Sequence, residues 1–95
     1  MYRTEIEVMQ HNLIHIRKSL NMSAIQFGEM IGLTRQSINN IESGRHKLSQ
    51  TQHLAILYVL EKQIFPKLDA EQKINIEKLL TDKVANRNYF DSLSF

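Results

Sequence analysis

Apolar side chains recur at helical spacing along most of the chain and divide it into five segments. The first begins near residue 5, after a start expected to fray, and its apolar residues follow one another at alternating intervals of three and four: Ile6, Met9, Leu13, Ile16 and Leu20. This spacing predicts an amphipathic helix. His11 and His15 fall opposite the stripe. No third ligand accompanies them in the sequence, so we interpret them as a solvated pair and predict no metal site.

A tight joint separates two short helices in the middle of the chain. Ser23 and Gln26 have the spacing of a capping box, which begins the first helix. Gly32 follows its last apolar residue, where a left-handed residue ends a helix. Thr34 then caps a second helix over about residues 35–42. Two helices joined by about three residues that include glycine are typical of a helix-turn-helix.

The second short helix has two different faces. Ile38 and Ile41 fall on one side and are expected in a core. The other side has no apolar side chain and no carboxylate. Its guanidinium and amide groups match base edges in the major groove, so the predicted base contacts are Arg35, Gln36, Asn39 and Asn40. A merely solvated helix face is the alternative that composition leaves open.

Positive charge is concentrated around this helix. Residues 17–50 hold five cations and two anions, whereas residues 61–95 hold six of each, and the whole chain has a net charge of +2. This placement is the expected footprint of a nucleic-acid partner. The residues predicted to face phosphates are Ser23, Ser43, Arg45 and Lys47, with Lys18 assisting. The alternative for residues 45–47 is an ordinary solvated loop that contacts no phosphate.

A family resemblance rests on Gly28, Gly32, Ile38, Ile41 and the run Glu42-Ser43-Gly44-Arg45. From about Leu13 to Leu60, roughly half the chain, the sequence resembles the lambda-repressor/Cro-like helix-turn-helix family, also called XRE-type transcriptional regulators. The resemblance implies an all-α, lambda-repressor-like bundle of four helices, to which this chain adds a C-terminal fifth helix. It also implies a structural ion pair between Arg17 and Glu42, and binding as a dimer to two half-sites.

Two positions depart from the family pattern. Ala24 stands where a Gln commonly binds phosphate, so that contact is lost or supplied by Ser23. Leu48 stands where a Pro usually follows the loop, which leaves the path of the loop open. Neither change touches the expected core.

The fourth segment is apolar almost all the way round. Ser49 and Gln52 begin it as a capping box, and residues 54–60 carry only apolar or aromatic side chains. Such a helix must be covered on every side, by the helix-turn-helix core and by a further helix or subunit. We expect Tyr58 in the core, with its hydroxyl at the boundary.

The fifth segment follows a proline break. Phe65 precedes Pro66 and is expected to avoid the helical region. Asp69 then caps a fifth helix, which we expect to reach about Ala85, to cover the fourth helix and to build a dimer. The tail, residues 86–95, is rich in aromatic side chains, and a docked arm is favoured over a frayed end.

The predicted organisation is a DNA-binding domain over residues 1–64 and a dimerisation element over residues 65–95, packed on it. The chain has no cysteine, no apolar run of about 20 residues and no signal peptide, so we expect a cytoplasmic protein without a membrane partner. It also has no Gly-rich phosphate loop, and no enzyme activity and no cofactor are predicted.

The sequence therefore favours a sequence-specific regulator of transcription that binds double-stranded DNA as a homodimer and acts as a repressor. The alternative is an antitoxin-like or adaptor protein that binds a protein partner through residues 65–95.

Overall fold

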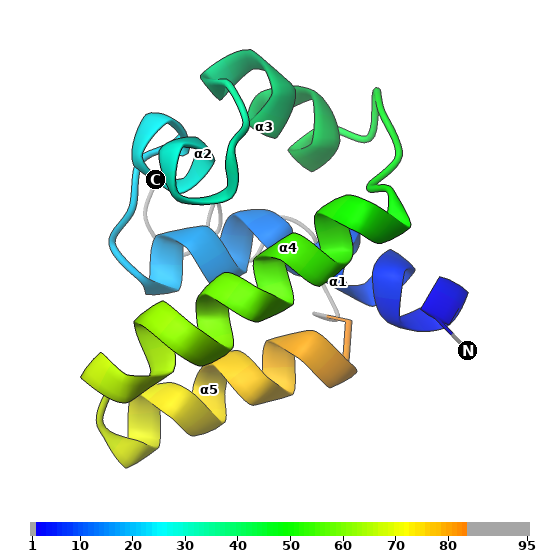
Figure 1. The fold of residues 1–95 in the computed structure, drawn as a ribbon. Helices are drawn as coiled ribbons and strands as arrows, with labels where there is room; N and C mark the ends of the chain where they lie inside the picture. The colour runs from blue at the N-terminus through cyan, green and yellow to red at the C-terminus, as the bar shows by residue number, and fades with distance from the viewer. Residues whose placement is uncertain (1, 84–95) are drawn as a thin grey trace, which may run out of the picture.

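The computed structural model describes residues 2–83, and the side chains from Thr4 onward, as a bundle of helices (Figure 1). The elements in chain order are α1 (Tyr2–Ser19), α2 (Ala24–Ile31), α3 (Arg35–Glu42), α4 (Gln50–Val59), a π-helical turn (Leu60–Ile64), a 3-10 turn (Phe65–Lys67) and α5 (Ala70–Thr81). No strand occurs in this part of the chain, which confirms the all-α prediction. The predicted role of the tail, residues 86–95, lies outside the described residues.

The helices begin at the caps that the sequence predicts. The Ser23 hydroxyl accepts the Gln26 N–H at 3.1 Å, and the Gln26 side chain accepts the Ser23 N–H at 2.9 Å. The same reciprocal arrangement begins α4 and α5, at Ser49 with Gln52 and at Asp69 with Gln72. Thr34 caps α3 by accepting the Ser37 N–H at 3.1 Å. Each cap contributes about 1 kcal/mol, so local chemistry fixes where these helices start.

The first helix begins earlier than the sequence predicts. Residues 2–5, expected to fray, already belong to α1. Thr4 and Glu5 line a hollow together with Leu57 of α4 and Leu80 of α5. The first turns of α1 thus lie beside two other helices, a neighbourhood that periodicity along the chain cannot reveal.

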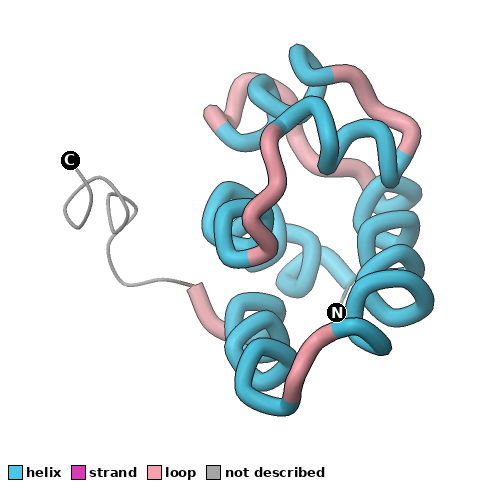
Figure 2. The backbone as a smooth tube through the Cα atoms, turned by 90° about the vertical axis from the view of Figure 1, so that its left-hand side faces the viewer, coloured by secondary structure: helices cyan, strands magenta, loops and turns pink. Residues whose placement is uncertain are grey.

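One face of α1 packs on the helix-turn-helix. Its stripe of Met9, Leu13 and Ile16 is fully buried, and these side chains belong to the same core cluster as Phe27 of α2 and Ile38 of α3. Figures 1 and 2 show α2 and α3 at one end of the molecule and α5 at the other, with α1 and α4 between them. The outer side of α3 and the C-terminal helix α5 are therefore well separated.

The opposite face of α1 is covered by α5, which corrects two expectations. We expected α5 to cover α4, but its main contact is α1. We also expected His15 to be solvated, whereas its side chain is only 2% exposed. His15 shares the face of α1 that contains the buried residues Val8 and Asn12, at helical spacing, and α5 packs along that face.

Asn12 ties the two helices together. Its side chain has no exposed surface, and its amide nitrogen donates to the carbonyl oxygens of Leu79 and Asp82, both at 2.7 Å. Asp82 is extended, with φ −128° and ψ 127°, so α5 ends at Thr81 rather than near Ala85. The buried amide satisfies carbonyls that the end of a helix leaves without partners.

The end of α4 also differs from prediction. The helix continues through the π-helical turn, and Phe65 is helical, with φ −54° and ψ −39°, although it precedes Pro66. Tyr58 is 62% exposed rather than in the core, and Leu54, one turn before it, is 47% exposed. One apolar face of α4 thus remains uncovered by the described residues.

The joint between α2 and α3 depends on two glycines. Gly32 ends α2 in the left-handed region, with φ +76°, which an L-residue rarely adopts. A Cβ on Gly28 would overlap the carbonyl oxygen of Leu33 and would lie 3.4 Å from Ile38 Cγ1. The missing side chain of Gly28 therefore leaves room both for the backbone of the turn and for the close approach of α3.

Candidate nucleic-acid interface

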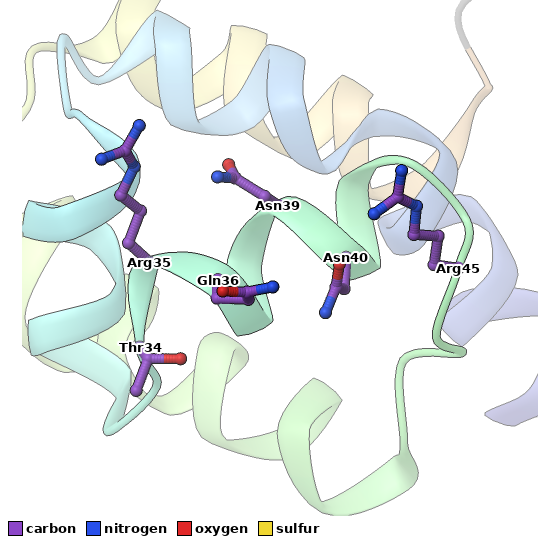
Figure 3. Close-up of a pocket in the computed structure, with 6 residues that line it drawn as sticks. All are labelled: Thr34, Arg35, Gln36, Asn39, Asn40 and Arg45. Carbon is purple, nitrogen blue, oxygen red and sulfur yellow. The ribbon is translucent and has the colours of Figure 1, made fainter.

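The outer side of α3 forms a polar surface. Ile38 and Ile41 point inward and are buried. A shallow hollow on the solvent side is lined by Thr34, Arg35, Gln36, Asn39, Asn40 and Arg45 (Figure 3). The structure thus brings all four predicted base-contact residues together on one surface and adds Arg45 from the following loop. None of these side chains is apolar and none is a carboxylate.

The side chains of this surface point outward. Arg35, Gln36 and Asn39 are exposed, and Asn40 is half-buried. In Figure 3, Arg35, Asn39 and Arg45 project to one side of the helix while Gln36 and Asn40 face the viewer. Guanidinium and amide groups in this arrangement can make paired hydrogen bonds to the edges of bases.

An ion pair fixes the end of α3 on α1. Arg17 donates from Nε to Glu42 Oε2 at 2.7 Å and from Nη2 to Oε1 at 3.0 Å, and the two side chains are 12% and 7% exposed. Arg17 also donates from Nη1 to the Met22 carbonyl at 3.0 Å. This is the pair that the family resemblance implies. It also places an opposite charge against Glu42, the carboxylate closest in sequence to the predicted base-contact residues.

The predicted phosphate contacts are more dispersed. Ser43 and Arg45 adjoin the end of α3, and Lys47 is exposed in the same loop. Ser23 is exposed at the start of α2, where its hydroxyl already caps the helix. Lys18 is half-buried near the end of α1. Of these five residues, only Arg45 lines the hollow over α3.

Sequence reasoning missed the residue that holds the basic loop. The Gln10 side chain on α1 donates to the carbonyls of Ile41 and His46, at 3.0 and 2.7 Å, and accepts the Leu48 N–H at 2.9 Å. A proline at residue 48 could not supply that N–H. Gln10 lies one step from the apolar stripe of α1, and nothing in its local spacing signals a partner more than 30 residues away.

Away from this surface, the structure shifts the pKa of His53. His53 of α4 is buried, and this burial lowers its pKa, while the negative charge of Glu5 opposes the shift. It borders the hollow between α1, α4 and α5, away from the polar surface of α3.

In the part of the chain that the structure describes, no three potential metal-ligating side chains gather. No described helix has the length and apolar character needed to cross a bilayer.

Comparison with known proteins agrees with this geometry. The family model described as helix-turn-helix matches residues 13–60, slightly more than half of the chain. The match contains α2, α3 and α4 and the last seven residues of α1. No curated protein and no solved structure matches the chain.

Proposed function

We propose that this chain, which belongs to the lambda-repressor-like helix-turn-helix family of DNA-binding regulators, reads a specific DNA sequence with α3 and represses transcription as a homodimer. In this proposal α3 enters the major groove, and Arg35, Gln36, Asn39 and Asn40 contact base edges. Ser23, Ser43, Arg45, Lys47 and Lys18 contact phosphates, which fix the register without reading sequence.

The observation that supports this proposal most is the composition of the surface over α3. Six outward side chains, two of them arginines and three of them amides, line one hollow without a carboxylate. A phosphate-lined groove attracts such a surface, and base edges offer partners to each group on it.

Selection of bound duplexes from a random library tests the reading function. We expect a recovered sequence of two inverted half-sites about 34–36 Å apart, because a dimer presents α3 twice with two-fold symmetry. Recovery of unrelated sequences, with equal affinity for all of them, would contradict sequence-specific reading.

The sequence led us to expect the dimer contact in residues 65–95; in this proposal the uncovered face of α4 takes that place, because α5 packs mainly on α1 while Leu54 and Tyr58 of α4 stay exposed. Leu54 and Tyr58 are large, apolar or aromatic, exposed and one turn apart, so they form a continuous strip on that helix. We expect Leu54→Lys or Tyr58→Lys to give monomers in sedimentation experiments and to weaken binding to the two-fold site. The matched control is Ile74→Lys, since Ile74 is 51% exposed on α5. Dissociation by Ile74→Lys alone would place the dimer contact on α5 instead.

Exposed Ile74 also favours a second function, in which residues 65–95 bind a protein partner as an antitoxin or adaptor would. A partner retained in native purification, and lost both on deletion of residues 86–95 and in Ile74→Lys, would support this role. Steeply salt-dependent binding of duplex DNA without such a partner would support the regulator alone.

The repressor assignment has its own test. We expect a reporter gene with the selected site placed across its promoter to be silenced by the wild-type chain, and to be released by Asn40→Ala. Increased expression would indicate an activator.

A further inference from the structure

We infer that Gln10, a residue that does not face DNA in the proposed complex, positions the basic loop after α3 so that Arg45 and Lys47 reach phosphates. This inference rests on the proposed DNA-binding function and names the residue that organises its phosphate-contacting side. Gln10 is thus a positioning residue that acts through the loop.

The loop has few other constraints from outside itself. Residues 43–47 are exposed and belong to no helix. Its short-range backbone hydrogen bonds run from Ser43 N–H to the Asn39 carbonyl at 2.9 Å, and from Gly44 N–H to the Ile41 carbonyl and His46 N–H to the Asn40 carbonyl, both at 3.2 Å. The Ser43 hydroxyl also donates to the Asn40 carbonyl at 3.2 Å. These bonds hold the loop to the end of α3 but do not hold it to the rest of the fold. Leu48, which is buried, is the point where the chain returns to the core.

Gln10 supplies the missing attachment. From α1 its single amide group bonds to three backbone groups: the Ile41 carbonyl at the end of α3, the His46 carbonyl and the Leu48 N–H. The two carbonyls can only accept and the N–H can only donate, so the three partners determine which way the amide is turned. With the amide reversed, all three contacts would be mismatched.

The residue that receives the shortest of these bonds lies between the two cations. His46 stands between Arg45 and Lys47, and its carbonyl is 2.7 Å from Gln10 Nε2. Fixing the backbone at His46 restricts where both neighbouring side chains begin. Binding then requires less ordering of the loop, because the conformational entropy has already been lost on folding.

A double-mutant cycle tests this inference on a short labelled duplex of random sequence, for which phosphate contacts provide nearly all of the affinity. The variants are Gln10→Leu, the loop variant Arg45→Ala/Lys47→Ala, and their combination. The matched control is Gln63→Leu, because Gln63 is exposed in the turn after α4. Thermal melting confirms that each variant is folded at the temperature of the binding measurement.

We expect Gln10→Leu to weaken binding about tenfold and to reduce the slope of log affinity against log salt by about 0.9–1.8, as loss of one or two phosphate contacts requires. The combined variant should bind no worse than the loop variant alone, since Gln10 acts through the same two cations. A structural role alone would change the melting temperature without changing the salt slope.

Additive losses, or a Gln10→Leu protein that is folded and has the wild-type salt slope, would overturn the role of Gln10. If Gln10→Leu does not fold, Gln10→Glu replaces it in the cycle, because it keeps the acceptor for the Leu48 N–H and removes the two donors. Absence of salt-dependent binding by the wild-type protein would instead refute the proposed function itself.

Discussion

Arg17 and Glu42 form a two-point ion pair between the first helix and the last residue of α3, with N···O distances of 2.7 and 3.0 Å. Both side chains are largely withdrawn from solvent. The pair therefore joins the scaffold to the helix that we propose to enter DNA.

We expect Arg17→Met to lower the free energy of unfolding by about 3–5 kcal/mol, because the largely buried Glu42 carboxylate would lose both bonds from the Arg17 guanidinium. Chemical denaturation measures this loss, with Lys62→Met as an exposed control. The double variant Arg17→Met/Glu42→Leu should recover part of the loss, since it leaves no buried charge. A cost below about 1 kcal/mol would mean that the pair behaves as an exposed one.

We expect Asn12→Ala to loosen α5 before it loosens the helix-turn-helix. The change leaves the Leu79 and Asp82 carbonyls without the Asn12 amide, which costs about 1–3 kcal/mol. Hydrogen exchange should show lower protection in α5 with little change in α2 and α3. Asn75→Ala, at an exposed position on α5, is the matched control. Uniform loss of protection in all helices would contradict a local role.

We expect the free energy of unfolding to decrease as the pH is lowered, because of His53. Burial lowers its pKa in the folded chain, so below the ordinary value of about 6.5 the unfolded chain binds more protons than the folded one. The stabilisation is complete above that value and is lost as pH falls through the folded pKa, with a slope of up to about 1.4 kcal/mol per pH unit.

Denaturation of the wild type and of His53→Gln between about pH 7.5 and 5 measures this effect. The variant should have a flatter profile over that range. Glu5→Gln should extend the wild-type loss to lower pH, because it removes the charge that opposes the shift. Parallel profiles for the wild type and His53→Gln would exclude His53 as the cause.

We expect Asn40→Ala and Lys47→Ala to affect DNA binding differently. Asn40→Ala should cost about 1–3 kcal/mol on the selected duplex and relax the preference at one base position, because Asn40 lines the polar surface of α3 that we propose to contact bases. Lys47→Ala should weaken selected and random duplexes alike and lower the salt slope by about 0.9. Fluorescence anisotropy on both duplexes separates these effects. Equal losses on both duplexes for both variants would contradict the assignment.

Sequence reasoning was most accurate where a structure depends on neighbours in the chain. Three capping boxes, the left-handed Gly32 and the inward Ile38 and Ile41 all follow from spacings of a few residues. The family resemblance added the Arg17–Glu42 pair, which spans 25 residues and has no local signal.

Sequence reasoning failed where the decisive contact comes from a distant helix. Opposite the apolar stripe, Asn12 and His15 lie on a side of α1 that periodicity assigns to solvent, but α5 covers it. Likewise, the three bonds of Gln10 connect positions 31 to 38 residues apart. Hydrophobic periodicity shows which face of one helix is apolar, but it does not identify which element will pack against a mixed face.

The hydrogen bond from the Leu48 N–H to Gln10 has a consequence for protein engineering. A consensus approach would install at residue 48 the proline that the family commonly uses. Here that substitution would delete a buried leucine side chain and the hydrogen that Gln10 accepts. Residues 10 and 48 therefore have to be redesigned together, because the consensus residue at either position does not take account of the hydrogen bond between them.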